Sequence, residues 1–168
     1  EGGPDLAQCF DLVRRATRPS APQVLRLLDY VIFNALIGNH DAHAKNFSLL
    51  YSGKAPVLAP SYDTLSTAAY PTMTQKMAMK IGSNYKFSEV QARHWEQFAE
   101  SVGLTKAQAK RRILELAKLL PANARKLQFA PERGFVKNDV VEQISTLIEH
   151  RCALTIRRLN VPATESSV

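Results

Sequence analysis

A short polar segment carries most of the residues in this chain that could do chemistry. Residues 39–46 read Asn-His-Asp-Ala-His-Ala-Lys-Asn, which combines two histidines, an aspartate and a lysine with amide side chains. Apolar segments flank it, and Ser61-Tyr62-Asp63 follows downstream. So many ionisable groups between two apolar segments indicate a functional site, and three kinds of chemistry compete for it.

The first interpretation is a metal-dependent hydrolase. His40, Asp41 and His43 are residue types that bind zinc or iron. However, His40 and Asp41 are adjacent and would point apart in most backbones. The other histidines, His94 and His150, fall in predicted helices without an H-E-x-x-H arrangement, so this interpretation is disfavoured.

The second interpretation is phosphoryl transfer. Protein kinases place a magnesium-binding asparagine five residues after the aspartate that acts as the base, and Asp41 and Asn46 have this spacing. Asn46 would give a neutral oxygen to a hard cation, and Asp63 would bridge that cation to the phosphates. Lys45, or a protonated His43, would neutralise charge on the transferred group.

The third interpretation is purely structural. Asn39, Asp41 and Asn46 are residue types that cap helices and turns through their side chains. Asp63 has the same option at the turn of residues 64–66. This explanation serves any one of the residues well, but it explains less well why all of them occur together.

The elements around this segment follow from hydrophobic spacing. Residues 6–16 have helical periodicity, and residues 24–37 are apolar nearly all round, which predicts a helix buried at the domain centre. We expect Ser20 to cap that helix, with Pro22 in its first turn. Gly38-Asn39 is a typical helix end, so the polar segment is expected to follow directly.

A β-hairpin is predicted next. Residues 47–51 and 57–59 are short apolar runs, and residues 52–54 between them form a turn signal. Such a hairpin would bring Asn46 and Asp63, at the ends of its two arms, close together.

The rest of the chain is expected to be helical after one further strand, because residues 76–81 alternate and residues from Ser88 onward have helical spacing. Its expected landmarks are a cap at Ser88, a helix end near Gly103, a capping box at Thr105, an interruption or kink at Pro121 and a helix start at Asn138 or Asp139.

Composition limits the class of protein. The 168 residues, 45% of them hydrophobic, suit one globular domain, and a net charge of +7 favours an anionic partner. Cys9 and Cys152, far apart, fit free thiols in a reducing cytoplasm. No apolar run reaches the length of a membrane span, and no signal pattern is visible. The N-terminus lacks Met, and we expect a C-terminal piece of a longer protein.

Basic residues cluster between residues 106 and 126. They are Lys106, Lys110, Arg111, Arg112, Lys118, Arg125 and Lys126. They could form a phosphate-binding patch that assists binding to DNA, or simply the solvated face of a helix. No aromatic residues are interleaved with them, which argues against a single-strand binder.

Three motifs resemble the C-terminal part of the HipA family, serine/threonine kinases that are the toxins of bacterial HipBA toxin–antitoxin pairs. They are IGNHDAHAKNFS at 37–48, LAPSYD at 58–63 and MAMKIG at 77–82, and EGGP at 1–4 also matches. The resemblance implies an α+β fold, mainly α with a small β-hairpin, of the protein-kinase C-terminal-lobe type. This lobe would span residues 1–162, with a disordered tail at 163–168.

The resemblance also implies roles for the residues of the site. Asp41 matches the catalytic base, and Asn46 and Asp63 match the ligands of Mg²⁺, with ATP as the substrate. The residues expected to line the nucleotide are His43, Lys45, Asn46, Tyr62 and Asp63.

The family further implies partners and a location. Its target class is an aminoacyl-tRNA synthetase, the enzyme for glutamate, phosphorylated on serine, which causes growth arrest and persistence. Its usual partner is a HipB-like helix-turn-helix antitoxin that represses the operon, so operator DNA is a further expected partner through that complex. We expect a cytoplasmic protein with no membrane partner.

Two departures from the family qualify these expectations. No Gly-rich loop followed by a nucleotide-gripping lysine precedes Asp41, so the isolated fragment is expected to be inactive. Glu96 and Glu100 follow the stretch Arg93-His94-Trp95, on a helix that contacts DNA in some family members, and this disfavours direct DNA contact there. The alternative function is a non-catalytic module that binds an antitoxin or DNA, although such a module would be expected to have lost at least one of the three acidic and amide site residues.

Overall fold

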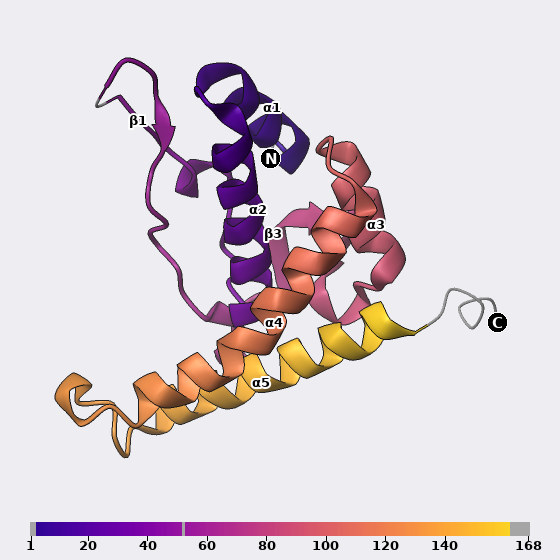
Figure 1. Ribbon diagram of the computed structural model, residues 1–168. Coiled ribbons are helices and arrows are strands. Elements are labelled where there is room, and N and C mark those ends of the chain that lie inside the picture. The colour runs from indigo at the N-terminus through magenta and orange to yellow at the C-terminus, as the bar shows by residue number, and fades with distance from the viewer. Residues whose placement is uncertain (1–2, 52, 162–168) are drawn as a thin grey trace.

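A buried helix forms the centre of the fold. The computed structural model describes residues 3–51 and 53–161, so the predicted tail at 163–168 lies outside the described residues. Helix α1 (Leu6–Ala16) leads into α2 (Ser20–Ile37), which contacts α1, α4 and α5 (Figure 1). The prediction of a buried helix is confirmed. The predicted cap is wrong, because Ser20 is the first helical residue and the cap position is Pro19, without a side-chain hydrogen bond.

Two small antiparallel hairpins flank this helix. Strands β1 (Leu49–Leu50) and β2 (Val57–Leu58) form the predicted hairpin, although each strand is shorter than expected. Strand β3 (Lys76–Ile81) is also confirmed. Its partner β4 (Asn84–Lys86) was not predicted, because it is short and polar and lacks a period-two pattern.

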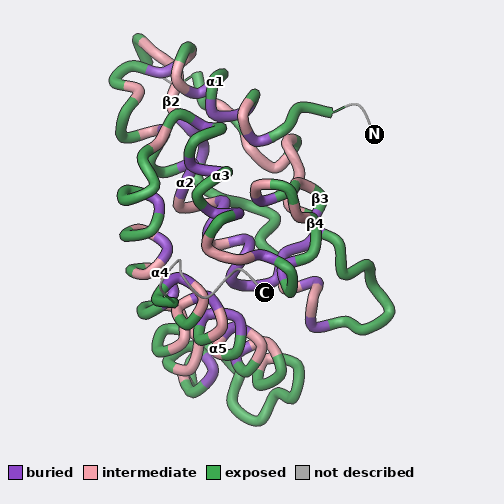
Figure 2. The backbone as a smooth tube through the Cα atoms, turned by 90° about the vertical axis from the view of Figure 1, so that its right-hand side faces the viewer, coloured by how far each residue is buried: buried purple, intermediate pink, exposed green. Residues whose placement is uncertain are grey.

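The C-terminal half consists of three helices, α3 (Ala92–Ser101), α4 (Lys106–Gln128) and α5 (Asp139–Asn160). Helices α4 and α5 form a long antiparallel pair whose tip projects from the body (Figure 1). The exposed residues 131–140 join them, and the buried residues gather in the body of the molecule (Figure 2). As predicted, a capping box at Thr105 starts α4, and Asn138 caps α5.

A predicted helix cap is wrong, and a predicted helix interruption is absent. Ser88 lies in a 3₁₀ turn (Phe87–Glu89), and the cap position of α3 is Gln91. Pro121 does not interrupt α4. A proline removes one helical hydrogen bond, and here the packing of α4 along α5 keeps the helix continuous.

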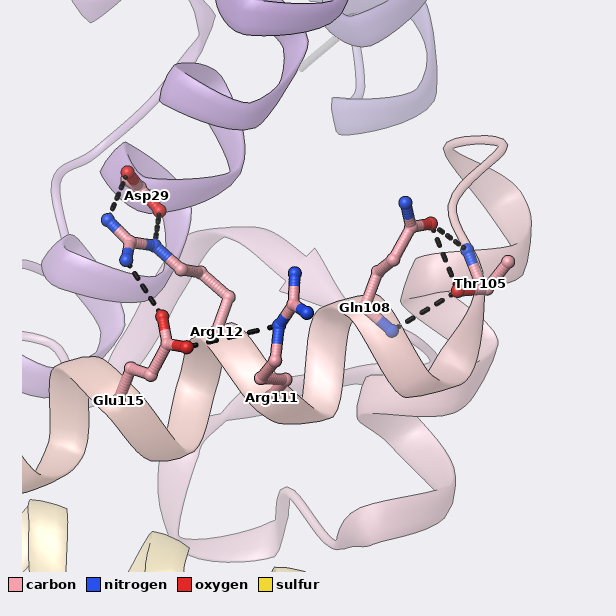
Figure 3. A network of polar contacts seen from close by, with 6 residues as sticks. All are labelled: Asp29, Thr105, Gln108, Arg111, Arg112 and Glu115. Atoms are coloured by element: carbon pink, nitrogen blue, oxygen red, sulfur yellow. Dashed lines mark hydrogen bonds and ion pairs between the residues drawn. The ribbon is translucent and has the colours of Figure 1, made fainter.

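The core is closed by aromatic contacts and by an ion-pair clamp. The ring of Phe98 meets those of Phe10 and Trp95 edge-on, at centroid distances of 5.8 and 6.1 Å. Arg112 of α4 pairs with Asp29 of α2 and with Glu115 of its own helix (Figure 3). The clamp therefore fixes α4 against the central helix.

This clamp is one of several ion pairs formed by the cluster of basic residues between 106 and 126. Four of its seven members are paired with carboxylates, namely Lys106, Arg111, Arg112 and Arg125. Lys106 pairs with Glu96 and Glu100 of α3 at 3.3 and 3.2 Å. These pairs favour the interpretation of a solvated helix face over a phosphate-binding patch.

Within the described residues, no helix has the length and apolar character needed to cross a membrane.

Candidate functional site

The polar segment begins where the central helix ends. Gly38 has a left-handed backbone with φ of 78°, and the Asn39 N–H donates to the carbonyl of Asn34 at 2.9 Å. The Gly38 carbonyl accepts a hydrogen bond from the Ala68 N–H at 2.9 Å. A left-handed residue that ends a helix is most often glycine. The start of the polar segment is therefore fixed both by the helix end and by the 3₁₀ turn Thr67–Ala69.

The side chain of Asn39 forms hydrogen bonds to the backbone of both candidate acidic residues, Asp41 and Asp63. Its buried side chain donates from Nδ2 to Asn34 Oδ1 at 2.9 Å and to the Asp63 carbonyl at 3.0 Å. Its Oδ1 accepts the Asp41 N–H at 3.1 Å. One buried amide thus sets the backbone of both Asp41 and Asp63. The sequence indicated only a capping role for Asn39, because its contact with Asp63 spans 24 residues.

Asn46 and Asp63 meet, as the hairpin predicted. Asn46 Nδ2 donates to Asp63 Oδ2 at 2.7 Å, and Asn46 Oδ1 accepts the His43 N–H at 3.0 Å. Asp63 has a positive φ of 55°. A left-handed non-glycine residue costs about 1–3 kcal/mol and persists where its surroundings hold it, and here the Asn39 bond to the Asp63 carbonyl provides such a restraint.

The remaining predicted site residues lie on the same loop and on the segment that faces it. Asp41 and Lys45 are exposed, and neither side chain has a hydrogen bond or ion pair with any residue that the structure describes. The Tyr62 hydroxyl donates to the Lys45 carbonyl at 2.8 Å and contacts Ser48 Oγ at 2.6 Å. His43 has a buried Nδ1 without a partner among residues 3–51 and 53–161. Asp41 and Lys45 are thus accessible to a ligand.

The other histidine of the loop, His40, points into the protein. Its backbone N–H donates to Thr67 Oγ1 at 2.8 Å, and its ring Nδ1 donates to the Thr74 carbonyl at 3.0 Å. The described part of the chain contains no group of three His, Cys, Asp or Glu side chains that could hold a metal ion. The interpretation as a His-rich metal hydrolase therefore has no support from the geometry.

The buried position of His40 predicts acid sensitivity. Burial, the main cause, and the nearby Arg151 charge lower the His40 pKa from its ordinary 6.5. Between pH 6.5 and that lower pKa, the unfolded imidazole binds a proton that the folded one does not, so stability falls as pH falls. His40→Asn, which keeps a donor near the Nδ1 position, is expected to flatten this decline in unfolding free energy, measured by urea denaturation from pH 7.5 to 5.

A control separates this effect from general acid instability. His150, exposed on α5, supplies it: His150→Asn should keep the slope of the wild-type protein. His94, whose pKa is also lowered, mainly by burial, accounts for a residual slope in the His40 variant. An equal slope in the wild type and in His40→Asn would refute the prediction.

The donor set of the loop suits a hard cation. Asp63 offers a carboxylate and Asn46 an amide next to it, with the amide nitrogen facing Asp63 and the amide oxygen accepting the His43 N–H. A rotation of the Asn46 side chain would bring its oxygen beside the carboxylate, and Mg²⁺ is typically bound by one or two such protein oxygens together with substrate phosphates. An accessible carboxylate at Asp41 stands on the same loop, on a backbone position tied to that of Asp63 by Asn39. This arrangement can bind a metal–phosphate group and accept a proton next to it.

Comparisons with known proteins agree on one family. A family model described as "HipA-like C-terminal domain" matches residues 1–124. A "Putative kinase Y4mE" of Sinorhizobium fredii is 48% identical over 116 residues, which cover 69% of this chain and 28% of that protein. The "Serine/threonine-protein kinase toxin HipA" of Shewanella oneidensis is 27% identical over 119 residues, 71% of this chain and 27% of the toxin. The chain thus spans little more than a quarter of the length of these two relatives.

A solved structure shows the same fold. It is the complex of Shewanella oneidensis HipA with HipB and operator DNA, matched with a TM-score of 0.82 and 22% identity over 97% of this chain and 39% of that chain. The likeness confirms the predicted kinase-like α+β fold. The likeness concerns the fold alone, and the roles of the individual site residues stay predictions.

Proposed function

Since this chain belongs to the family of HipA-like C-terminal domains, we propose that it is the catalytic lobe of a serine/threonine protein kinase. The single observation that best supports this function is the 2.7 Å contact between Asn46 and Asp63, 17 residues apart. It joins the two proposed metal ligands, and the Asn39 amide links the backbone of Asp63 to that of Asp41. A merely structural loop does not need an accessible carboxylate at this point.

The proposed reaction uses the loop as follows. Asp41 accepts the proton of a serine or threonine hydroxyl, whose oxygen attacks the γ-phosphorus of ATP. The bond from that phosphorus to the bridging oxygen breaks, and ADP leaves. Asn46 and Asp63 would hold Mg²⁺, which neutralises charge on the phosphates when bound.

The other predicted residues would serve the nucleotide. Lys45 is the accessible cation of the loop, and it would stabilise the charge that develops on the transferred phosphoryl group. Tyr62 holds the Lys45 carbonyl and thereby fixes that part of the loop. His43, which is half-buried, would line the nucleotide with its ring.

We further propose that the isolated chain is inactive and that the full-length protein acts in the cytoplasm. No Gly-rich loop with a following lysine precedes Asp41, so the nucleotide would be gripped from one side only. By family membership we propose a HipB-like antitoxin and, through it, operator DNA as partners. The proposed substrate class is an aminoacyl-tRNA synthetase, that for glutamate in the family, with growth arrest and persistence as the result.

Metal binding tests the proposal directly. In the full-length protein with ATP, Asp63→Asn is expected to weaken Mn²⁺ binding by at least about tenfold, because a ligand and its charge are lost. Mn²⁺ titration followed by electron paramagnetic resonance measures this without relying on turnover. Asp11→Asn, which changes an exposed carboxylate of α1, is the matched control and should bind as the wild type does. Equal Mn²⁺ affinity in Asp63→Asn would rule out the proposed metal site.

A further inference from the structure

One arginine of α5 is buried without a carboxylate partner. Arg151 is 9% exposed, and none of its contacts within the described residues is with an acidic side chain. Burial lowers the pKa of its guanidinium to about 10, so it remains charged at neutral pH. Removing a charge from water is expensive unless hydrogen bonds compensate for it, which directs attention to the groups that Arg151 contacts.

Those groups lie at the end of the central helix. Both Nε and Nη2 of Arg151 donate to the Ala35 carbonyl, at 2.9 and 2.7 Å. Ala35 lies in the last turn of α2, where its carbonyl has a long backbone hydrogen bond of 3.4 Å from the Gly38 N–H and where a cation is favoured by the helix dipole. The guanidinium also stacks on the Phe87 ring, 3.6 Å from its centroid. Arg151 therefore clamps the last turn of α2.

The same face of α5 continues beneath the loop. A Cβ added to Gly38 would lie 3.1 Å from Leu147 Cδ2 and 3.7 Å from Arg151 Cζ. One turn before Leu147, Gln143 donates to the Ala69 carbonyl at 2.7 Å. These residues follow each other at intervals of four, so they share one side of the helix. We call Gln143, Leu147 and Arg151 the α5 floor.

The floor reaches the site through a short series of contacts. Arg151 donates hydrogen bonds to the Ala35 carbonyl. Gly38, at the end of the same helix, lies against Leu147 and Arg151 of the α5 floor. Asn39 comes next, and its side chain fixes Asp41 and Asp63. A shift at the end of α2 would move the amide that sets both acidic residues.

We propose that Arg151 is a positioning residue of the active site, which holds the end of α2 so that Asn39 places Asp41 and Asp63 correctly. This inference rests on the proposed kinase function. It assigns a role in the reaction to a helix outside residues 1–124, the part of the chain that the family model matches.

A second arginine of α5 provides a matched control. Arg158 also donates to backbone carbonyls, those of Val90 at 2.7 Å and Ser88 at 2.8 Å, with a longer contact of 3.4 Å to that of Phe87. These carbonyls precede α3 and have no contact with the loop in the hydrogen bonds of the described chain. Replacing Arg158 thus removes a comparable clamp from the same helix without touching the end of α2.

The test compares Arg151→Met with Arg158→Met in the full-length protein. Both are expected to lower the thermal unfolding midpoint. Only Arg151→Met should lower kcat for phosphate transfer, by about tenfold or more, with KM for ATP within about threefold of wild type, because misplacement of a base affects the chemical step most. Rates are measured well below both unfolding midpoints.

Conservative variants keep the test decisive if a methionine variant does not fold. Arg151→Lys retains the charge and one donor to Ala35 but loses the two-pronged geometry and part of the stacking. It should recover part of kcat relative to Arg151→Met, or show a reduced kcat relative to Arg158→Lys. A wild-type kcat in Arg151→Lys and Arg151→Met, or an equal loss in the Arg158 variants, would overturn the inference.

A parallel Asp41→Asn measurement separates the two proposals. If Asp41→Asn loses activity while the Arg151 variants keep it, the inference fails and the kinase function stands. If Asp41→Asn keeps full activity, the proposed function fails and takes the inference with it.

Discussion

Asp41→Asn is expected to reduce phosphate transfer by the full-length protein by roughly a hundredfold to ten-thousandfold, the contribution of a general base. Asparagine has nearly the same shape as aspartate but cannot accept the proton of the incoming hydroxyl. Such a loss corresponds to about 3–5 kcal/mol of transition-state stabilisation. The transfer of labelled phosphate from ATP, at saturating ATP and Mg²⁺, measures it.

The same variant should fold as well as the wild type. Asp41 is exposed, and its carboxylate has no partner among the residues that the structure describes, so its unfolding free energy should change by less than about 0.5 kcal/mol. Asp11→Asn, at an exposed carboxylate that pairs with Arg15 at 2.7 Å, controls for the loss of one negative charge. A stable Asp41→Asn protein with wild-type turnover would contradict the role of Asp41 as the base, whereas a wild-type protein without any turnover would support a non-catalytic interaction module.

Local patterns predicted the part of the site that is built from local structure. The apolar run before Gly38 fixes the buried helix and its end, so the position of the loop follows from periodicity and one glycine. The apolar runs at 47–51 and 57–59 predict the hairpin, and the hairpin brings Asn46 to Asp63. Each step needs only residues that are near each other in the sequence.

Other parts of the fold depend on contacts that no local pattern records. Ser88 looks like a helix cap, yet Arg158, 70 residues away, donates a hydrogen bond to its carbonyl and holds the 3₁₀ turn there. Pro121 looks like a helix break, yet the packing of α4 on α5 overrides it. In both cases tertiary contacts outweigh a residue's intrinsic preference.

The residues that hold the site in place, Arg151 and Asn39, were not predicted in that role, because their contacts are also distant in the sequence. Arg151 lies 116 residues from Ala35, and the contact of Asn39 with the Asp63 carbonyl spans 24. An arginine in the middle of an amphipathic helix ordinarily indicates its solvated face, and burial is the exception. Only the three-dimensional arrangement distinguishes Arg151 from the exposed Arg157 on the same helix.

The second large effect is expected at Asn39. Asn39→Leu keeps the approximate volume of the side chain but leaves Asn34 Oδ1, the Asp63 carbonyl and the Asp41 N–H without their partner. Each unpaired buried polar group costs about 1–3 kcal/mol, so the unfolding free energy should fall by about 3 kcal/mol or more. The rate of phosphate transfer should fall roughly a hundredfold, because both acidic residues lose their anchor.

Asn34→Leu distinguishes the two effects of this change. Asn34 is buried, donates to the Tyr30 carbonyl at 2.9 Å and accepts one bond from Asn39 Nδ2 at 2.9 Å, so its loss also destabilises the protein, as chemical denaturation would show. It leaves intact the bonds from Asn39 to Asp63 and Asp41, and turnover of the folded protein should therefore stay within about threefold of wild type. If both variants lose stability and rate in the same proportion, the amide of Asn39 only stabilises the fold. If Asn39→Leu alone loses rate, the buried amide sets the geometry on which the reaction of Asp41 depends.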